Sequence, residues 1–133
     1  MKTVLCNGCF DILHLGHVEH LKEARSLGDL LVVALTEDEF VNKGPGLPIN
    51  KWEDRRDMLI ALRLVDSVTP SRSCVDAIKL VKPDIFVKGV DYLNSPLLLP
   101  ARAACKEIGA TLHITKTPKR SSSDIIKRIK ELP

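Results

Sequence analysis

Six consecutive apolar residues, Leu30 to Leu35, constrain the fold of this chain more than any other stretch. A strand that faces solvent on one side alternates apolar and polar residues, whereas a strand covered on both faces reads as a continuous apolar run. Strands of the second kind belong to parallel sheets that lie between layers of helices. The run therefore predicts a parallel sheet buried on both sides.

The rest of the chain alternates further strand patterns with helical ones. Strands are expected at residues 2–6, 30–35, 65–69, 85–87 and 111–114, and helices at 16–27, 50–62, 74–82, 96–108 and 121–132. This alternation predicts an α/β fold, a doubly wound five-stranded parallel sheet with helices on both faces and right-handed crossovers. Because the sequence shows no internal repeat and no linker, residues 1–133 are expected to form a single domain.

Two helices carry more detailed expectations. Asn50 should cap the helix that follows it, with Glu53 completing a capping box. The buried face of that helix should carry Trp52, Met58, Leu59, Ala61 and Leu62. The last helix should begin at the serines before Asp124, and its apolar side should consist of Ile125, Ile126, Ile129 and Leu132.

An anion site is expected where the first strand passes into the first helix. Gly8 supplies a turn after the strand, and the free N–H groups at the helix start, near Gly16, favour a phosphate. His14 and His17 are three residues apart, so they can meet on one face and donate hydrogen bonds to a phosphate whose charge grows during a reaction. A lone histidine is more often structural, but a glycine-framed pair favours a functional role.

The composition suits a small enzyme of phosphorylated molecules. The net charge of +3 is mildly basic, and the basic residues are scattered except between Lys116 and Lys130, so we expect no nucleic-acid partner. No signal peptide or membrane-length apolar run is evident, so we expect a cytoplasmic protein without a membrane partner. Cys6 and Cys9 form a C-x-x-C, which permits a thioredoxin-like redox pair as an alternative, although we interpret each as a small apolar residue.

Gly8, Cys9, Phe10 and Asp11, followed by His14, Leu15, Gly16 and His17, resemble the signature of the cytidylyltransferase-like nucleotidyltransferases. The resemblance extends over nearly the whole chain. It implies a Rossmann-like fold and a histidine-x-glycine-histidine motif that binds a nucleoside triphosphate. The implied reaction is attack by a substrate phosphate on the α-phosphorus, with loss of pyrophosphate. Such a step needs positioning and positive charge rather than a protein nucleophile.

The resemblance also implies roles for residues on loops that leave the carboxyl ends of the strands, where open α/β sheets bind ligands. Catalytic roles are expected for His14, His17, Lys43 and Arg55. Nucleotide contacts are expected from Gly8, Cys9, Phe10, Gly16, Lys88, Gly89, Asp91, Arg120, Ser121, Ser122 and Ser123. Substrate contacts are expected from Asp11 and Asp38. No protein metal site is assigned, but Mg²⁺ is expected because triphosphate chemistry nearly always requires it.

One motif departs from the family pattern of arginine-x-x-glycine-x-serine-threonine-threonine. Lys116 and Lys119 take the arginine and glycine positions, and serines replace both threonines. Arg120 can supply the missing guanidinium. The alteration also leaves room for a nucleotide sensor without turnover.

The loop from Lys88 to Tyr92 and the ending Ser123 to Lys127 favour the heptose 1-phosphate adenylyltransferase branch, with ATP and a sugar phosphate as substrates. The glycerol-3-phosphate cytidylyltransferase type, which uses CTP, is the second candidate because it shares Thr36 to Phe40 closely and has a similar length. Relatives of the FAD synthase type come third. The resemblance further implies a homodimer. The sequence leaves the base and the acceptor phosphate open.

Overall fold

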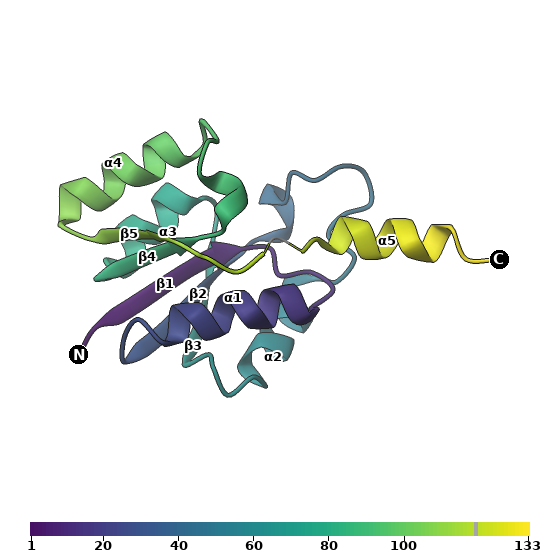
Figure 1. The fold of residues 1–133 in the computed structure, drawn as a ribbon, viewed down its shortest axis with the longest axis horizontal. Coiled ribbons are helices and arrows are strands. Elements are labelled where there is room, and N and C mark those ends of the chain that lie inside the picture. Colours follow the sequence, from purple (N-terminus) through teal and green to yellow (C-terminus); the bar gives the residue numbers. More distant parts are fainter. Residues whose placement is uncertain (119) are drawn as a thin grey trace.

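A computed structural model describes residues 1–118 and 120–133, and its five strands form one parallel sheet (Figure 1). The strands are β1 (Thr3–Gly8), β2 (Leu30–Thr36), β3 (Ser67–Ser71), β4 (Ile85–Lys88) and β5 (Thr111–Ile114). Their order across the sheet is β3-β2-β1-β4-β5, and every neighbouring pair is parallel. The strand order therefore reverses beside β1, and the predicted fold class is confirmed.

Helices cover both faces of the sheet, as the apolar run predicted. α1 (Leu15–Arg25) and α2 (Trp52–Ile60) pack on one face, and α3 (Cys74–Val81) and α4 (Leu98–Ile108) pack on the other. Two short 3₁₀ turns, η1 (Asp38–Phe40) and η2 (Val90–Tyr92), follow β2 and β4. α5 (Ser122–Lys130) projects beyond the carboxyl end of the sheet (Figure 1). None of the described helices combines the length and hydropathy needed to cross a bilayer.

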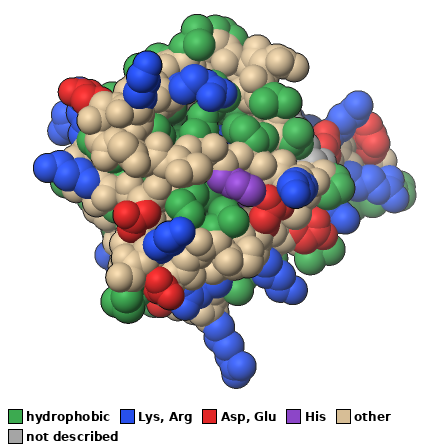
Figure 2. Space-filling view, turned by 60° about the vertical axis from the view of Figure 1, so that its left-hand side comes forward, with side chains coloured by type: hydrophobic (Ala, Val, Ile, Leu, Met, Phe, Trp, Pro, Cys, Tyr) green, Lys and Arg blue, Asp and Glu red, His purple; other side chains and the backbone are tan. Residues whose placement is uncertain are grey.

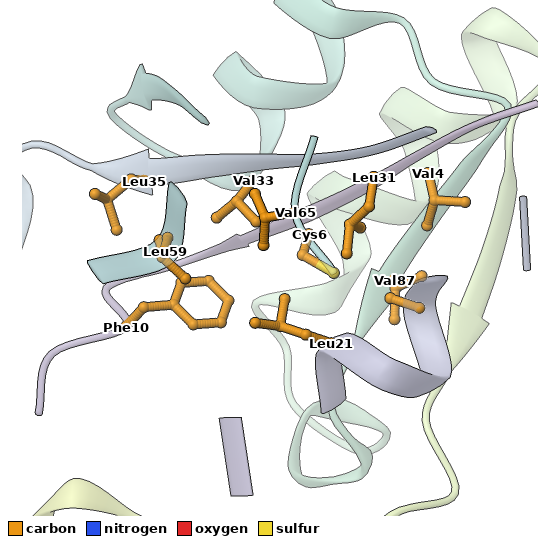
Figure 3. Close-up of a cluster of buried hydrophobic side chains, with 11 residues drawn as sticks. Val4, Cys6, Phe10, Leu21, Leu31, Val33, Leu35, Leu59, Val65 and Val87 are labelled. Atoms are coloured by element: carbon orange, nitrogen blue, oxygen red, sulfur yellow. The ribbon is translucent and has the colours of Figure 1, made fainter. Parts of the chain in front are cut away.

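The core is split between the two faces by the alternation of each strand. Val4 and Cys6 of β1 point toward α1 and α2, whereas Leu5 between them points toward α3 and α4, and all three are completely buried. Figure 3 shows the first cluster, in which the ring of Phe10 extends from the loop after β1 toward Leu59 and Leu21. The first residues of this loop are thus held by the core itself.

The second helix differs from its prediction. Lys51 rather than Asn50 is the residue before α2, and it makes no side-chain cap hydrogen bond. Met58 is 56% exposed because the face turned to the core carries Arg55 and Leu59 instead. Ala61 lies just beyond the end of the helix. A buried arginine in a helical pattern cannot be distinguished from a solvated one until its acceptors are known.

The third strand and the last helix also differ from expectation. β3 lies two residues later than predicted, at Ser67–Ser71, because this edge strand pairs with β2 through Ser67 and Ser71 as well as through apolar residues. Ile129 and Leu132 were expected on an apolar side, yet they are 58% and 54% exposed, and no residue of α5 is buried. Ile125 and Ile126, in the first half of the helix, are half-buried, and Ile126 lines a cavity with Leu47 and Pro48. The second half of the helix projects beyond these contacts, which leaves Ile129 and Leu132 exposed.

Candidate functional site

The histidine pair forms the N-terminal cap of α1. His14 Nδ1 accepts a hydrogen bond from the N–H of Gly16 at 3.0 Å, and His17 Nδ1 accepts one from the N–H of His14 at 3.3 Å. A neutral imidazole whose Nδ1 accepts must carry its proton on Nε2. The backbone therefore selects the same tautomer in both rings, whose centroids lie 4.0 Å apart.

Both rings are held neutral. Burial lowers the pKa of His17 to about 4, with further contributions from His14, Lys43 and His20. Burial and the nearby Arg120 also lower the pKa of His14. His14 Nε2 is shielded from solvent and has no hydrogen-bond partner among the described residues. The pair therefore offers neutral Nε2–H donors, and a buried donor without a partner is costly unless a ligand satisfies it.

The loop between β1 and α1 is strained and clamped. Phe10 and Ile12 both adopt positive φ angles, 45° and 52°, which residues other than glycine rarely do. Asp11, between them, accepts hydrogen bonds from the N–H groups of Ile49 and Asn50 at 2.5 and 3.1 Å and from the Asn50 side chain at 3.0 Å. Asp11 thus joins this loop to the end of the 42–50 loop.

Arg55 is buried on the same side of the sheet and links several loops by hydrogen bonds. Its side chain is 1% exposed, and it donates to the carbonyls of Asn50 and Cys9, each at 2.9 Å, and to Asp38 Oδ1 at 2.6 Å. Three separate segments are therefore held by one guanidinium. The structure places Arg55 against the loop after β1. Its predicted catalytic role stays a prediction, as does the predicted substrate contact of Asp38.

Lys88 and Asn7 form a buried polar network at the switch of strand order. Lys88 is 6% exposed; its Nζ donates to the Asn7 carbonyl at 2.9 Å and lies 4.4 Å from the centroid of the Tyr92 ring. The Asn7 side chain donates to the carbonyl of Ala34 at 2.9 Å and to Ser71 Oγ at 2.8 Å. Asn7 is not among the predicted site residues, although a polar residue at the end of an otherwise apolar strand can indicate a buried polar network.

Glycines allow close approaches around the pair. A side chain at Gly8 would meet the ring of Phe10 at 3.1 Å, and one at Gly89 would meet Asp91 Oδ1 at 2.6 Å. A side chain at Gly16 would come within 2.5 Å of Arg120 Cβ. The segment after β5 is therefore packed directly against the start of α1.

Residues from three distant segments surround a small cavity of about 20 Å³ next to this loop. Its lining includes Cys9, Asp11, Lys43, Ser122 and Ser123. Ser122 Oγ donates to the carbonyl of Asp11 at 2.6 Å, which fixes α5 to the loop after β1. The predicted residues of these three segments are thus brought together.

The other serine-motif residues take separate positions. Ser121 caps α5 by accepting from the N–H of Ser123, and Arg120 makes an ion pair with Glu19 at 3.5 Å. Lys119, where the family has glycine, lies outside the described residues. The nucleotide contacts expected of Arg120 and the three serines stay predictions.

The residues that the structure describes do not supply the donors of a resident metal site. Among residues 1–118 and 120–133, no group of three His, Cys, Asp or Glu side chains is placed to hold an ion. The carboxylates of Asp11 and Asp38 already accept from Asn50 and Arg55. A magnesium ion held by these residues alone does not fit the site.

The redox alternative also meets a physical obstacle. Cys6 is completely buried, and this burial raises the pKa of its thiol to about 12. Cys6 and Cys9 are both free thiols. A thiol that stays protonated is a poor nucleophile for disulfide exchange, so the C-x-x-C acts as packing rather than as a redox pair.

Comparison with known proteins agrees with the geometry. Residues 5–128 match the family described as cytidylyltransferase-like. The chain is 41% identical over 98% of its length to bifunctional protein HldE of Aliarcobacter butzleri, and 44% identical over 98% to bifunctional protein HldE of Aeromonas hydrophila. It spans only 27% and 28% of the length of these two relatives.

Solved structures show the same fold. The lipopolysaccharide core biosynthesis protein from Thermoplasma volcanium superimposes with a TM-score of 0.73 and 32% identity, covering 91% of this chain and 99% of that one. Pantoate-beta-alanine ligase from Francisella tularensis shares the fold with a TM-score of 0.64 at 15% identity, covering 97% of this chain and 69% of that one. Together with the histidine pair at the start of α1, these matches show that the chain belongs to the cytidylyltransferase-like family and is a nucleotidyltransferase.

Proposed function

We propose that this nucleotidyltransferase joins the nucleoside monophosphate of ATP to a sugar phosphate of the heptose 1-phosphate kind. A phosphate oxygen of the sugar forms a bond to the α-phosphorus of ATP. The bond between the α-phosphorus and its bridging oxygen breaks, and that oxygen leaves with pyrophosphate. The single observation that carries the proposal is the adjacent pair of His14 and His17 rings, each of which has Nδ1 accepting a backbone hydrogen bond and Nε2–H left as the donor.

The pair suits a phosphoryl centre for a physical reason. As the α-phosphorus is attacked, its oxygens gain negative charge, and donors fixed in advance stabilise that charge without reorganisation. The N–H groups and the dipole at the start of α1 add to the same field. Neutral imidazoles are suitable because they donate a hydrogen bond without first attracting a counterion to the empty site.

Cations on both sides of the pair suit the triphosphate. Lys43 lies exposed on the 42–50 loop and is close enough to depress the pKa of His17. Arg120 packs against Gly16, and its guanidinium is paired with Glu19 at 3.5 Å while its side chain is 52% exposed, so a phosphate can replace Glu19 as its partner. We propose that Mg²⁺ enters with the triphosphate, since the carboxylates nearby are already engaged by protein donors.

The preference for ATP and a sugar phosphate is supported by relatives named HldE at 41% to 50% identity. The alternative is a CTP-dependent enzyme of glycerol 3-phosphate or a similar polyol phosphate, which the same donors serve equally well. We also propose a homodimer, as the family resemblance implies.

The test measures pyrophosphate release with Mg²⁺, with ATP or CTP, and with heptose 1-phosphate or glycerol 3-phosphate as acceptor. We expect turnover with ATP and the sugar phosphate, and a loss of about 100-fold to 1,000-fold in kcat for His17→Ala, the usual effect of removing one such donor. His20→Gln, one turn further along α1 and outside the pair, is the matched control and should keep most activity. Turnover only with CTP and glycerol 3-phosphate would select the alternative. Nucleotide binding without any turnover would indicate a sensor.

A further inference from the structure

Glu23 of α1 binds a segment far from it in sequence. Its Oε2 accepts from Nε2 of His113 in β5 at 2.7 Å. Its two oxygens accept from the N–H of Lys116 at 2.9 and 3.0 Å, and Oε1 accepts from the N–H of Thr117 at 3.2 Å. The Glu23 side chain is only 18% exposed. One carboxylate thus accepts hydrogen bonds from a side chain of β5 and from two backbone N–H groups of the segment that follows this strand.

The segment that Glu23 binds leads directly to the predicted nucleotide contacts. It leaves β5 and passes along α1 to α5 (Figure 1). Arg120 packs its Cβ against Gly16 beside His14, and Ser122 Oγ then donates to the carbonyl of Asp11 at 2.6 Å. The segment is therefore attached at both ends, by Glu23 before Arg120 and by Ser122 after it.

We propose that Glu23 is a positioning residue for nucleotide binding: its carboxylate fixes the segment after β5 so that Arg120 and the serines stay beside the histidine pair. Glu23 itself does not reach the site, because it lies two turns beyond His17 and its oxygens are occupied by protein donors. The attachment of the segment stands independently, but its meaning for nucleotide rests on the proposed function.

A carboxylate suits this task better than an uncharged side chain. Hydrogen bonds to an ionised acceptor are roughly twice as strong as neutral ones. Burial raises the pKa of Glu23, but the hydrogen bonds from His113 and from the N–H groups of Lys116 and Thr117 outweigh it, so the net shift is downward. The group stays ionised at neutral pH. Figure 2 shows one histidine side chain at the surface of the face that it draws, with acidic and basic side chains near it.

The test compares Glu23→Gln with the matched control Glu107→Gln, an exposed residue of α4 on the opposite face of the sheet. The amide of glutamine keeps the size of the side chain but puts an NH₂ where one of the accepting oxygens was. We expect faster amide hydrogen exchange at Lys116 and Thr117, and a rise of about tenfold or more in the KM for ATP with kcat little changed, the loss of a charged hydrogen bond. Glu107→Gln should change neither.

Several outcomes would overturn the proposal. Unchanged exchange together with unchanged KM would show that Glu23 does not hold the segment in a way that matters to nucleotide. A fall in kcat at constant KM would place Glu23 in the chemical step instead. His113→Leu, which removes one donor and leaves the two backbone donors, should raise KM less but in the same direction. If it and Glu23→Gln both leave KM unchanged, the proposal fails.

A failure of the proposed function can be told apart by calorimetry with ATP alone. If the wild-type protein binds ATP but turns over no acceptor, weaker ATP binding by Glu23→Gln still supports the positioning role. Equal binding by the two proteins contradicts it.

Discussion

Replacing Arg55 with methionine tests whether one buried guanidinium holds the site together. Methionine fills much of the same volume but donates nothing to the two carbonyls and the Asp38 carboxylate that Arg55 contacts. Each carbonyl bond is worth about 1 kcal/mol net, and the charged one about 1.5–3 kcal/mol. Because the Asp38 side chain is 46% exposed, water recovers part of the charged bond, which then contributes about 1 kcal/mol, as much as each carbonyl bond. We expect a loss of about 3 kcal/mol in the free energy of unfolding.

The neighbouring Arg56 gives a matched control on the same helix. Its side chain is 37% exposed, pairs with Asp57 at 3.0 Å and lies 5.3 Å from the centroid of the Trp52 ring. Exposed pairs of this kind contribute about 0–1 kcal/mol, so Arg56→Met should cost little.

Urea denaturation, followed by circular dichroism, measures both changes. With a slope of about 2 kcal/mol per molar urea, typical for a chain of this size, a 3 kcal/mol loss lowers the midpoint by about 1.5 M. Arg55→Lys should fall between, because an ammonium cannot reach all three acceptors at once. If Arg55→Met and Arg56→Met shift the midpoint equally, the reasoning from burial and hydrogen bonds is wrong.

Three further results follow from the histidine helix. Gly16→Ala should destabilise the protein and lower kcat/KM by about 100-fold, because the new methyl would lie 2.5 Å from Arg120 Cβ and 2.8 Å from His14 Cε1; helix propensity alone predicts a gain of up to about 1 kcal/mol, so a stabilised variant in urea titration would mean the space is there. Nitrogen NMR of labelled histidine should show His14 and His17 protonated on Nε2 at neutral pH, and a protonated Nδ1 in either ring would contradict the capping geometry. Burial lowers the pKa values of His17 and His20 from 6.5 to about 4, so the unfolded chain takes up protons before the folded protein does. The free energy of unfolding should therefore fall as pH drops from about 6.5 to 4, and the stabilisation from the two neutral rings should be fully present above pH 6.5. A flat pH profile of stability there would show that these rings titrate normally.

The elements that the sequence predicted well are those whose pattern depends on burial alone. The apolar run Leu30 to Leu35 lies within β2, covered by helices on both faces as expected. His14 and His17 meet because their spacing is a property of any helix start. Both predictions depend only on the local geometry of a strand or a helix.

The features that the sequence did not reveal depend on partners distant in sequence. Arg55 is buried because its acceptors include the Cys9 carbonyl, 46 residues away. Glu23 meets Lys116 across 93 residues. Ile129 shows the converse: an amphipathic pattern says which side of a helix is apolar, but it does not say whether another element covers that side. Hydrogen bonds between segments far apart in sequence, such as those of Arg55 and Glu23, cannot be predicted from local sequence patterns.

The central position of β1 has a consequence for how the protein forms during synthesis. β1 pairs with β2 about 27 residues later, but its other neighbour, β4, follows only after some 80 residues. A ribosome therefore releases β1, β2 and β3 with their two helices well before β4 and β5 exist, whereas domains generally fold as units. The histidine pair belongs to this early half. Lys88 and the segment that Glu23 holds belong to the late half. If the proposed function holds, capture of nucleotide waits for the last strand, and a growing chain displays the histidine pair before it can hold the nucleotide.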